Sequence, residues 1–400
     1  MDDLCELTVI RDVRTARFCP GFYNGPMTQA LDICIRGSGI VGQTLALLLA
    51  RERLRVGLVA PAAAPDQPEA VADVRAYALN ARSRQLLDTL RCWPDPIHAT
   101  EVRAMQIKGD AGGDLSFGAG AMHVPGLTWI VDVPVLETQL AQAIRFQPQI
   151  ELLQAPRPAA LTVICEGRAS STRDELGVAY QTQSYHQHAI AARLQCSLPH
   201  GQTARQWFVG GDILAFLPLG GPLGTEVAMV WSVQADRAPA LLQADPADFC
   251  AELEALSGAC LGTLTLSSAR AAWPLQLSCA ERWIGQRDGR AWALAGDAAH
   301  AVHPLAGQGL NLGLADVATL ADILQKREYW RALGDHKLLR RYERARKAEV
   351  LPMSAAMDGL QQLFALDGNA WQTLRNWGMN GFERSGPIKQ WVARRAMGLT

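Results

Sequence analysis

The chain has 400 residues, of which 49% are apolar and 19% are charged. This is enough for one large domain or two ordinary ones, and it excludes extended disorder over most of the chain. The formal net charge of −1 gives no global attraction to nucleic acid, so we predict no nucleic-acid partner. The nine cysteines contain no CxxC pair, which favours reduced thiols in a cytoplasmic protein over a disulfide framework or a zinc site.

The first residues do not resemble a targeting segment. Residues 1–26 have neither the apolar block nor the cleavage pattern of a signal peptide, and Met27 directly precedes the first predicted strand. We predict that residues 1–26 are a loose tail or that the chain starts at Met27. The longest early apolar run, GIVGQTLALLLA, is too short to span a bilayer.

A βαβ unit opens the folded part. The pattern predicts a strand over 31–37, a helix over 41–54 and a second strand over 54–60. Between the first strand and the helix stands GSGIVG, where Gly37 permits a tight turn, Gly39 lets the backbone approach a diphosphate, and Gly42 lets helix and strand pack closely. We therefore predict a dinucleotide with its diphosphate at the N-terminus of the helix.

One part of that fingerprint is absent. The second strand of a dinucleotide fold ends in an acid that binds a ribose diol, but Ala60 stands there. Either another group holds the ribose or the dinucleotide binds less tightly.

The remaining elements follow in order. Leu79, Leu86, Leu87 and Leu90 predict a helix, and about 203–275 alternates like antiparallel strands around glycine turns. A buried strand is predicted over 290–296 and a helix over 310–325, and the chain is helical and amphipathic from about 326 onward.

The segment GDAAHAVHPLAGQGLNLG, residues 296–313, predicts the second half of the site. It delivers Asp297 at the end of a buried strand, where a carboxylate can accept hydrogen bonds from a polyol. Glycines 307, 309 and 313 let the backbone approach a flat ring, and the start of the next helix directs N–H groups at it.

Metal binding by His300 and His303 is the alternative for this segment. Pro304 breaks a helix there and no third ligand is evident nearby, so we predict no metal. A structural, hydrogen-bonded role is expected for His300, and a proton relay is an open alternative for His303.

Four segments, in order, resemble a known family. GSGIVG, RAYALNARSRQLL, EGRASSTR and GDAAHAVHPLAGQGLNLGLADVATLADIL are similar to motifs of the FAD-dependent aromatic hydroxylases of the para-hydroxybenzoate hydroxylase type, most of all to the ubiquinone-biosynthesis hydroxylases. The resemblance extends from about residue 31 to the C-terminus.

The resemblance implies a set of site residues. Gly37, Gly39 and Gly42 would hold the FAD diphosphate, Gly296 and Asp297 the ribityl chain, and Arg75 would lie near the flavin. The isoalloxazine ring would be lined by Pro304, Gly307, Gln308, Gly309 and Asn311, and the motif that contacts both FAD and NAD(P)H would be Glu166, Gly167, Ser170 and Arg173.

It also implies an α/β fold class, in which a Rossmann-like FAD-binding domain is interleaved with an antiparallel-sheet substrate domain and followed by a C-terminal helical segment. The expected FAD-binding segments are 27–105, 131–180 and 285–330; the substrate sheet takes 106–130 and 181–284, and the C-terminal helices take 331–400.

The implied function is an FAD-dependent monooxygenase that uses O2 and NAD(P)H. A flavin C4a-hydroperoxide would hydroxylate an aromatic ring, with a polyprenylated phenol of ubiquinone biosynthesis as the expected substrate. No catalytic residue is identified. The predicted walls of the substrate site, which are equally well explained as core, are Trp207, Phe216, Leu217, Pro218, Trp231 and Trp273.

Several alternatives stay open. Segment 326–350 is basic and either contacts anionic lipid at the inner face of a membrane or forms a solvated helix with ion pairs, which we favour. The protein is alternatively a flavin oxidase or dehydrogenase, or a non-catalytic flavoprotein subunit of a quinone-synthesis complex. The last is motivated by Ala60 and the short segment 140–166; Glu166 departs from the family as well, since it stands where an aspartate is usual.

Overall fold

The structure is a computed structural model that describes residues 30–60, 73–109, 112–302, 308–365, 381, 383 and 385–398. The predicted tail and Met27 lie outside the described residues, as do His303, Pro304 and Gly307.

A six-stranded sheet confirms the predicted βαβ opening. β1 pairs in parallel with β2 on one side and with β9 on the other, and β8 and β17 extend the parallel arrangement. The carboxyl ends of β1, β9 and β17 therefore meet at one edge, where a ligand of such a sheet is expected. In sheet order the strands are β16 (Ile284–Arg287), β17 (Arg290–Leu294), β9 (Ala159–Ile164), β1 (Leu31–Arg36), β2 (Val56–Val59) and β8 (Ile150–Leu153).

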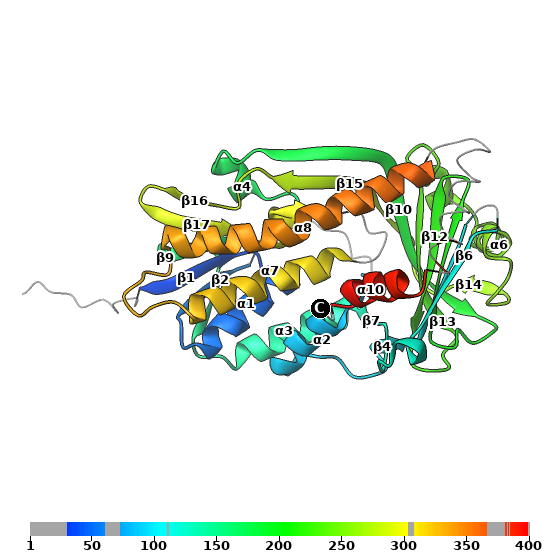
Figure 1. Cartoon of the computed structure of the whole chain (residues 1–400), viewed down its shortest axis with the longest axis horizontal. Coiled ribbons are helices and arrows are strands. Elements are labelled where there is room, and N and C mark those ends of the chain that lie inside the picture. Colours follow the sequence, from blue (N-terminus) through cyan, green and yellow to red (C-terminus); the bar gives the residue numbers. More distant parts are fainter. Residues whose placement is uncertain are drawn as a thin grey trace, which may run out of the picture. The chain divides into compact units, whose positions relative to one another are not determined.

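Helices pack beside this sheet. They are α1 (Ile40–Arg51), α3 (Val133–Arg145), α7 (Gln308–Gln325) and α8 (His336–Ala365). Figure 1 shows α7 between α1 and α8. Gly313 permits the close contact of α7 with α1, because a Cβ at this position would lie 2.9 Å from Cγ2 of Val41. The core between sheet and helices includes Ile33, Leu45, Leu49, Leu161, Val317 and Leu320.

A three-stranded antiparallel sheet corrects one prediction. Its strands, in order, are β3 (Ala76–Leu79), β7 (Thr128–Asp132) and β4 (Ala99–Val102). The predicted helix through Leu79 is wrong at its start, since α2 spans only Ala81–Thr89. The side chain of Asn80 caps α2 by accepting a hydrogen bond from the Ser83 N–H at 2.9 Å, and this N-cap signal separates strand from helix.

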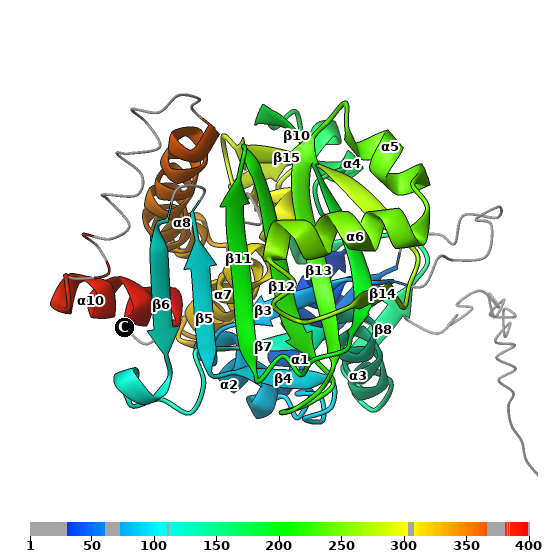
Figure 2. The same ribbon diagram turned by 90° about the vertical axis from the view of Figure 1, so that its right-hand side faces the viewer.

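The second large sheet has nine strands. Its order is β18 (His300–Ala301), β15 (Ala271–Ala280), β10 (Tyr180–Cys196), β13 (Glu226–Gln234), β12 (Asp212–Leu219), β11 (Thr203–Val209), β5 (Ala104–Lys108) and β6 (Asp114–Gly118), with β14 (Leu264–Leu266) beside β10. Neighbours are antiparallel except β11 and β5. Two helices that were not predicted, α5 (Ala238–Gln243) and α6 (Pro246–Ser257), cover its outer face (Figure 2).

The two large sheets are interleaved along the chain. Strands β5 and β6 join the nine-stranded sheet before β8 and β9 join the six-stranded one, and β18 pairs with β15 after the chain has passed through β17. The predicted fold class is confirmed, with a helical segment at the end that includes α10 (Pro387–Ala396). The exact segment boundaries stay a prediction.

Candidate active site

The turn between β1 and α1 has the form of a phosphate-binding turn. Gly37 has φ +108°, and a Cβ there would lie 2.4 Å from the carbonyl oxygen of Cys165. A Cβ at Gly42 would lie 1.9 Å from the carbonyl oxygen of Gly37, whereas a Cβ at Gly39 would meet nothing within 4 Å. Helix α1 has no side-chain cap and no acid in its first turn. The open space above Gly39 and the uncapped N–H groups fit a diphosphate.

The carboxylate of Glu166 is engaged by donors of this chain. Oε1 accepts from Arg36 Nε at 3.0 Å and from Thr172 Oγ1 at 2.6 Å, and Oε2 accepts from Ser170 Oγ at 2.8 Å and from the Thr172 N–H at 3.1 Å. Burial alone would raise the pKa of Glu166, but these hydrogen bonds hold it below its usual range. Glu166 thus connects the end of β9 to the end of β1 and to α4 (Ser171–Glu175).

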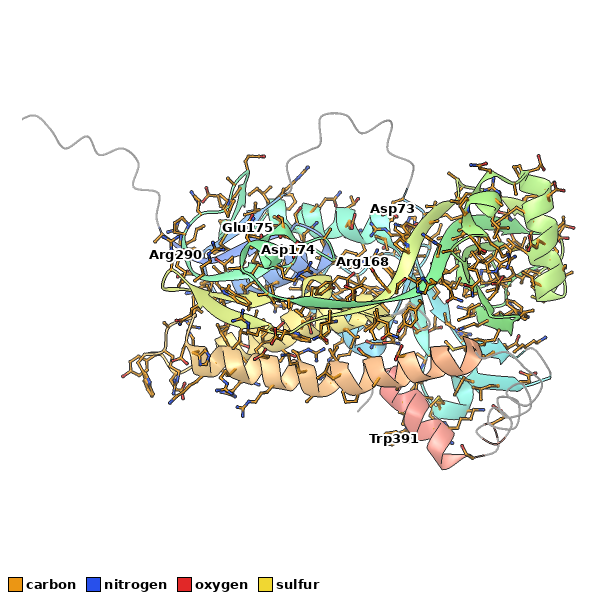
Figure 3. All side chains as sticks on the ribbon, turned by 90° about the horizontal axis from the view of Figure 1, so that it is seen from above. Asp73, Arg168, Asp174, Glu175, Arg290 and Trp391 are labelled. Carbon is orange, nitrogen blue, oxygen red and sulfur yellow. The ribbon has the colours of Figure 1, made fainter. Side chains whose placement is uncertain are left out.

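The residues after Glu166 face open space. Gly167 has φ +78°, and a Cβ there would meet nothing within 4 Å. Arg168 donates to the carbonyl oxygen of Pro274 at 3.3 Å, and its charge acts on the carboxylate of Asp297. Figure 3 shows Arg168 near Asp174 of α4. Sequence reasoning missed Arg168, which is a cation beside the predicted ribityl acceptor.

Arg173 supports the Asp297 turn from within the protein. Its side chain is buried, donates to the carbonyl oxygen of Ala298 at 3.4 Å, and lies 3.6 Å from the ring centroid of Tyr180. The Tyr180 hydroxyl donates in turn to the carbonyl oxygen of Asp297 at 2.7 Å. In this structure the motif arginine therefore positions the backbone that carries Asp297.

Asp297 follows directly from β17. Gly296, with φ +61°, turns the chain into the short helix η2 (Gly296–Ala298). Burial raises the pKa of the Asp297 carboxyl, and the charges of His300 and Arg168 oppose this rise. No donor among the described residues lies within hydrogen-bond distance of the Asp297 carboxylate. This is the condition expected of an acceptor that takes its hydrogen bonds from a ligand.

At the start of α7 the backbone at Gly309 is accessible, whereas the side chain of Asn311 is held by hydrogen bonds. A Cβ at Gly309 would meet nothing within 4 Å. Asn311, which is buried, accepts from the Asn80 N–H at 2.9 Å and from Ser83 Oγ at 2.7 Å, and it donates to the carbonyl oxygen of Ala78 at 2.8 Å. Asn311 thus fixes α7 to the β3–α2 junction, while Gly309 leaves its side of the helix accessible.

A cleft of about 280 Å³ lies along α7, between α2 and α8. Gln308 and Asn311 line one end of it, so it borders the predicted ring-binding segment. Its other walls include Ser83, Leu86, Leu314, Ala318 and Met353.

Arg75 lies beside β3 and is paired with acids. Its Nε donates to Asp73 Oδ1 at 2.8 Å, and its terminal nitrogen is 3.7 Å from Glu137. The hydrogen bond to Asp73 raises the pKa of Arg75. The neighbouring Tyr77 is close enough for the charges of Arg75 and Asp297 both to influence its pKa. Arg75 is thus engaged by acids of this chain, and Tyr77 lies within electrostatic range of both Arg75 and Asp297.

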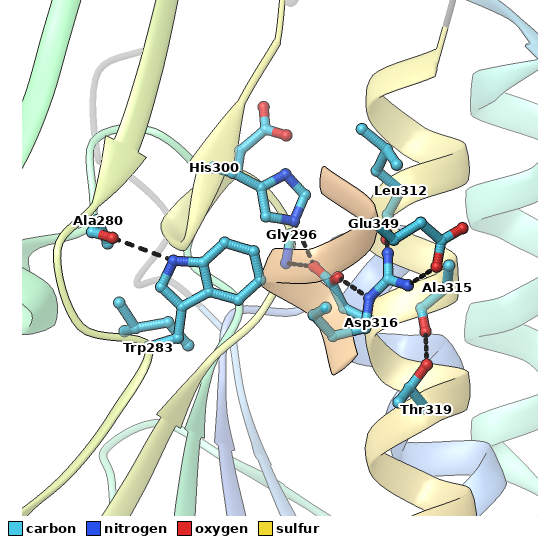
Figure 4. Close-up of polar contacts among 12 residues, drawn as sticks. Ala280, Trp283, Gly296, His300, Leu312, Ala315, Asp316, Thr319 and Glu349 are labelled. Atoms are coloured by element: carbon cyan, nitrogen blue, oxygen red, sulfur yellow. Dashed lines mark hydrogen bonds and ion pairs between the residues drawn. The ribbon is translucent and has the colours of Figure 1, made fainter. Parts of the chain in front are cut away.

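Sequence reasoning also missed a buried ionic cluster. Asp316 of α7 accepts hydrogen bonds from the Gly296 N–H at 2.8 Å, His300 Nε2 at 2.7 Å and Arg346 Nε at 2.7 Å (Figure 4). The sequence feature that could have revealed this cluster is Asp316 itself, an acid directly before the apolar residue Val317 in the predicted helix 310–325. His300 has the hydrogen-bonded structural role expected of it.

The metal alternative finds no support among the described residues. No group of three or more His, Cys, Asp or Glu side chains in this part of the chain is arranged to hold a metal ion. His303, the second histidine of the proposed pair, lies outside the described residues.

Comparisons with known proteins agree with this geometry. The profile of the FAD binding domain family matches residues 158–354. Ubiquinone hydroxylase UbiL of Rhodospirillum rubrum is 30% identical over 95% of this chain and 93% of its own length. The 3-demethoxyubiquinol 3-hydroxylase of Escherichia coli is 30% identical over 93% of this chain and 99% of its own. The chain belongs to this family of FAD-dependent aromatic hydroxylases.

A solved structure supports the fold of this hydroxylase. A variant of HpxO from Klebsiella pneumoniae, complexed with FAD, superposes with a TM-score of 0.69 at 14% identity and covers 92% of this chain and 98% of that one. The family match and the two bacterial relatives make the protein an FAD-dependent monooxygenase. Its diphosphate turn, the open backbone at Gly309 and the Asp297 carboxylate, which has no partner among the described residues, fit the cofactor.

Three of the six side chains predicted as walls of the substrate site are core. Trp207, Phe216 and Trp231 pack with Phe249 of α6 on the outer face of the nine-stranded sheet. Strand alternation therefore points the opposite side chains of β10, β12 and β13 toward the FAD-binding half. Leu217 lies on that inner face, where it packs against a cluster that contains Ile130.

None of the described helices is long and apolar enough to cross a membrane.

Proposed function

We propose that this hydroxylase adds a hydroxyl group to the ring of a polyprenylated phenol in ubiquinone biosynthesis, with NAD(P)H as the reductant. The names of the two bacterial relatives support the pathway. The observation that carries the substrate class is the chemistry of the inner face of the nine-stranded sheet.

Small uncharged side chains form a row across that face. The strand register places Ala271 beside Ala191, Ala191 beside Val230, and Val230 beside Ala215. Ala271, Val230 and Ala215 are only half-buried although they belong to interior strands of the sheet. Short side chains with remaining exposure leave room for a bulky apolar molecule.

Arg193, a cation on the same face, is already paired with an acid. Arg193, one row further along β10, donates from both terminal nitrogens to the two carboxylate oxygens of Asp132, at 3.0 and 2.8 Å. A carboxylated substrate would need a free cation in this position, because burying an unpaired charge is costly. The row therefore favours a neutral phenol with an apolar substituent.

The mechanism divides between cofactor and protein. Bound FAD supplies the activation of O2, which no side chain can provide. The glycine turn would bind the diphosphate, and Asp297 would accept hydrogen bonds from the ribityl chain. The row of small side chains formed by Ala271, Ala191, Val230 and Ala215 would orient the ring and exclude water. We assign no proton-transfer role to a described residue.

We propose a cytoplasmic protein that meets its lipid-like substrate at the inner face of the membrane or within a quinone-biosynthesis complex. The basic segment 326–350 is not the surface we favour for this contact, because several of its cations pair with acids of this chain. Lys326 lies 2.6 Å from Asp322, and Lys347 lies 2.9 Å from Glu343.

Quinone analysis of a deletion strain tests the proposal. Mass spectrometry of its lipid extract should show an accumulated prenylated phenol that lacks one hydroxyl group, and the intact gene should restore the mature quinone. An unchanged quinone pool would contradict the proposal.

A second measurement separates hydroxylation from simple oxidase activity. The purified protein with NAD(P)H, O2 and a short-chain prenylated phenol should yield hydroxylated product in step with oxygen consumption. Oxygen consumption without product would favour a flavin oxidase, and failure to retain FAD would favour a non-catalytic subunit.

A further inference from the structure

The Asp316 cluster joins four parts of the chain that surround the predicted cofactor turn. Asp316 is on α7, Gly296 begins η2, His300 is on β18 and Arg346 is on α8. The side chain of Asp316 is fully buried, and those of His300 and Arg346 are 2% exposed. Of these residues only Gly296 is expected at the cofactor, and its contact with Asp316 is made through the backbone N–H.

The carboxylate of Asp316 is held in its charged form. Burial alone would raise its pKa, but His300 and Arg346 hold the pKa below the usual range. A charged carboxylate only accepts hydrogen bonds, and three donors converge on it within 2.8 Å. A buried ion pair contributes little net stability relative to apolar packing, so a positional role is the better account of its presence.

The geometry shows what is positioned. The Gly296 N–H that Asp316 binds belongs to the residue immediately before Asp297, and Gly296 has φ +61°. His300 is fixed a second time, by stacking on Trp283 with ring centroids 4.9 Å apart. Asp316 therefore restrains both ends of the turn that carries the Asp297 carboxylate.

We propose that Asp316, held by Arg346 from α8, is a positioning residue for FAD. It sets the direction of the Asp297 carboxylate without touching the cofactor, so that helix α8 takes part in the cofactor site through a buried charge. This inference rests on the proposed role of Asp297 as the ribityl acceptor.

The variant Asp316→Asn tests the inference because it keeps the shape of the side chain but removes its charge and one acceptor. Apo-protein would be titrated with FAD, and the reduction potential of the bound flavin and its visible spectrum would be recorded. We expect FAD affinity to fall at least tenfold, with a shifted potential, in protein that still shows a folded near-ultraviolet circular dichroism spectrum. Asp322→Asn is the matched control, since Asp322 is on the same helix but exposed and paired only with Lys326.

Wild-type affinity, potential and spectrum in folded Asp316→Asn would overturn the inference, even if its melting temperature falls. If Asp316→Asn does not fold, FAD titration of the variant Arg346→Lys tests the inference instead. Lysine keeps the charge but not the guanidinium geometry, so weakened FAD binding supports the inference and unchanged binding overturns it. Failure of the wild-type chain to bind FAD would instead refute the proposed function.

Discussion

Gly39 and Gly42 are both glycines of one turn, yet the structure requires them for different reasons. At Gly42 a methyl group would collide with the backbone of Gly37, so the fold itself excludes a side chain. At Gly39 no other protein atom would lie within 4 Å of a Cβ, so the fold does not require a glycine there, whereas a bound diphosphate would. The two positions therefore separate a folding requirement from a binding requirement.

The variants Gly42→Ala and Gly39→Ala test this distinction. Gly42→Ala should lower the free energy of unfolding of apo-protein by about 1–3 kcal/mol, because the backbone must shift. Gly39→Ala should change it by less than about 1 kcal/mol. FAD affinity should nevertheless fall at least about tenfold, equivalent to about 1.4 kcal/mol, because the methyl group enters the diphosphate space. Urea denaturation and FAD titration check both values, and unchanged FAD affinity in Gly39→Ala would contradict the assignment.

Asp297 predicts a pH dependence of cofactor binding. Burial raises its pKa in the free protein, and donors from the ribityl chain would lower the pKa in the complex because they favour the charged form. FAD should therefore bind most tightly above the raised pKa of Asp297 and lose affinity as the pH falls through that pKa toward the ordinary range of an aspartate.

Titration of apo-protein with FAD at several pH values measures this effect. Asp297→Asn should flatten the profile, and Asp297→Ala should give colourless protein. A yellow, fully active Asp297→Ala variant would show that another group holds the ribityl chain.

At the scale of elements, α7 links the parts of the site. Gly313 allows its contact with α1, Asp316 holds the Gly296 turn, and Asn311 fixes the β3–α2 junction. Periodicity predicted this helix over 310–325 because its buried leucines recur at helical spacing, but it could not show which polar side chains face inward to partners distant in sequence.

The variant Asn311→Ala tests the link. It leaves the Asn80 N–H and the Ala78 carbonyl without their partner, which should cost about 1–3 kcal/mol of unfolding free energy. Gln325→Ala, at the exposed end of the same helix, should cost less than about 0.5 kcal/mol. Equal losses in the two variants, measured by chemical denaturation, would argue against a linking role.

Predictions from local sequence patterns also failed where tertiary contacts determine the secondary structure or the buried face of a strand. Ala76–Leu79 was assigned to a helix because Leu79 matches the spacing of later leucines, yet pairing with β7 makes it a strand. The sequence left Trp207 and Trp231 open between substrate wall and core, because the strand pattern does not say which face is covered. The unpredicted helices α5 and α6 cover their side of the sheet and turn them into core.

At the scale of the whole molecule, the two turns of the site could be predicted because their motifs are local, whereas the interleaved architecture was implied by the resemblance to a family. The glycine turn and the acid at the end of a buried strand each occupy a few consecutive residues, and parallel strand order brings them to one edge. Contacts between the sheets could not be predicted this way. The pair Arg193–Asp132 joins β10 to β7 across 61 residues.

A double-mutant cycle on this pair tests how the sheets are joined. Arg193→Met and Asp132→Asn should show a coupling energy of at least about 1 kcal/mol, because both side chains are largely buried. The pair Arg237–Glu252 is more than two-fifths exposed on both sides, and it should couple by less than about 1 kcal/mol. Additive losses at Arg193 and Asp132 would show that apolar packing alone joins the sheets.

The central claim is that one FAD is held between the glycine turn after β1 and the Asp297 turn after β17. Visible absorbance of the purified chain, with stoichiometric titration of its apo-form with FAD, tests this most directly. We expect a yellow protein with one FAD per chain, and loss of that binding in both Gly39→Ala and Asp297→Ala. A chain that carries no flavin and takes none up when FAD is supplied would contradict it.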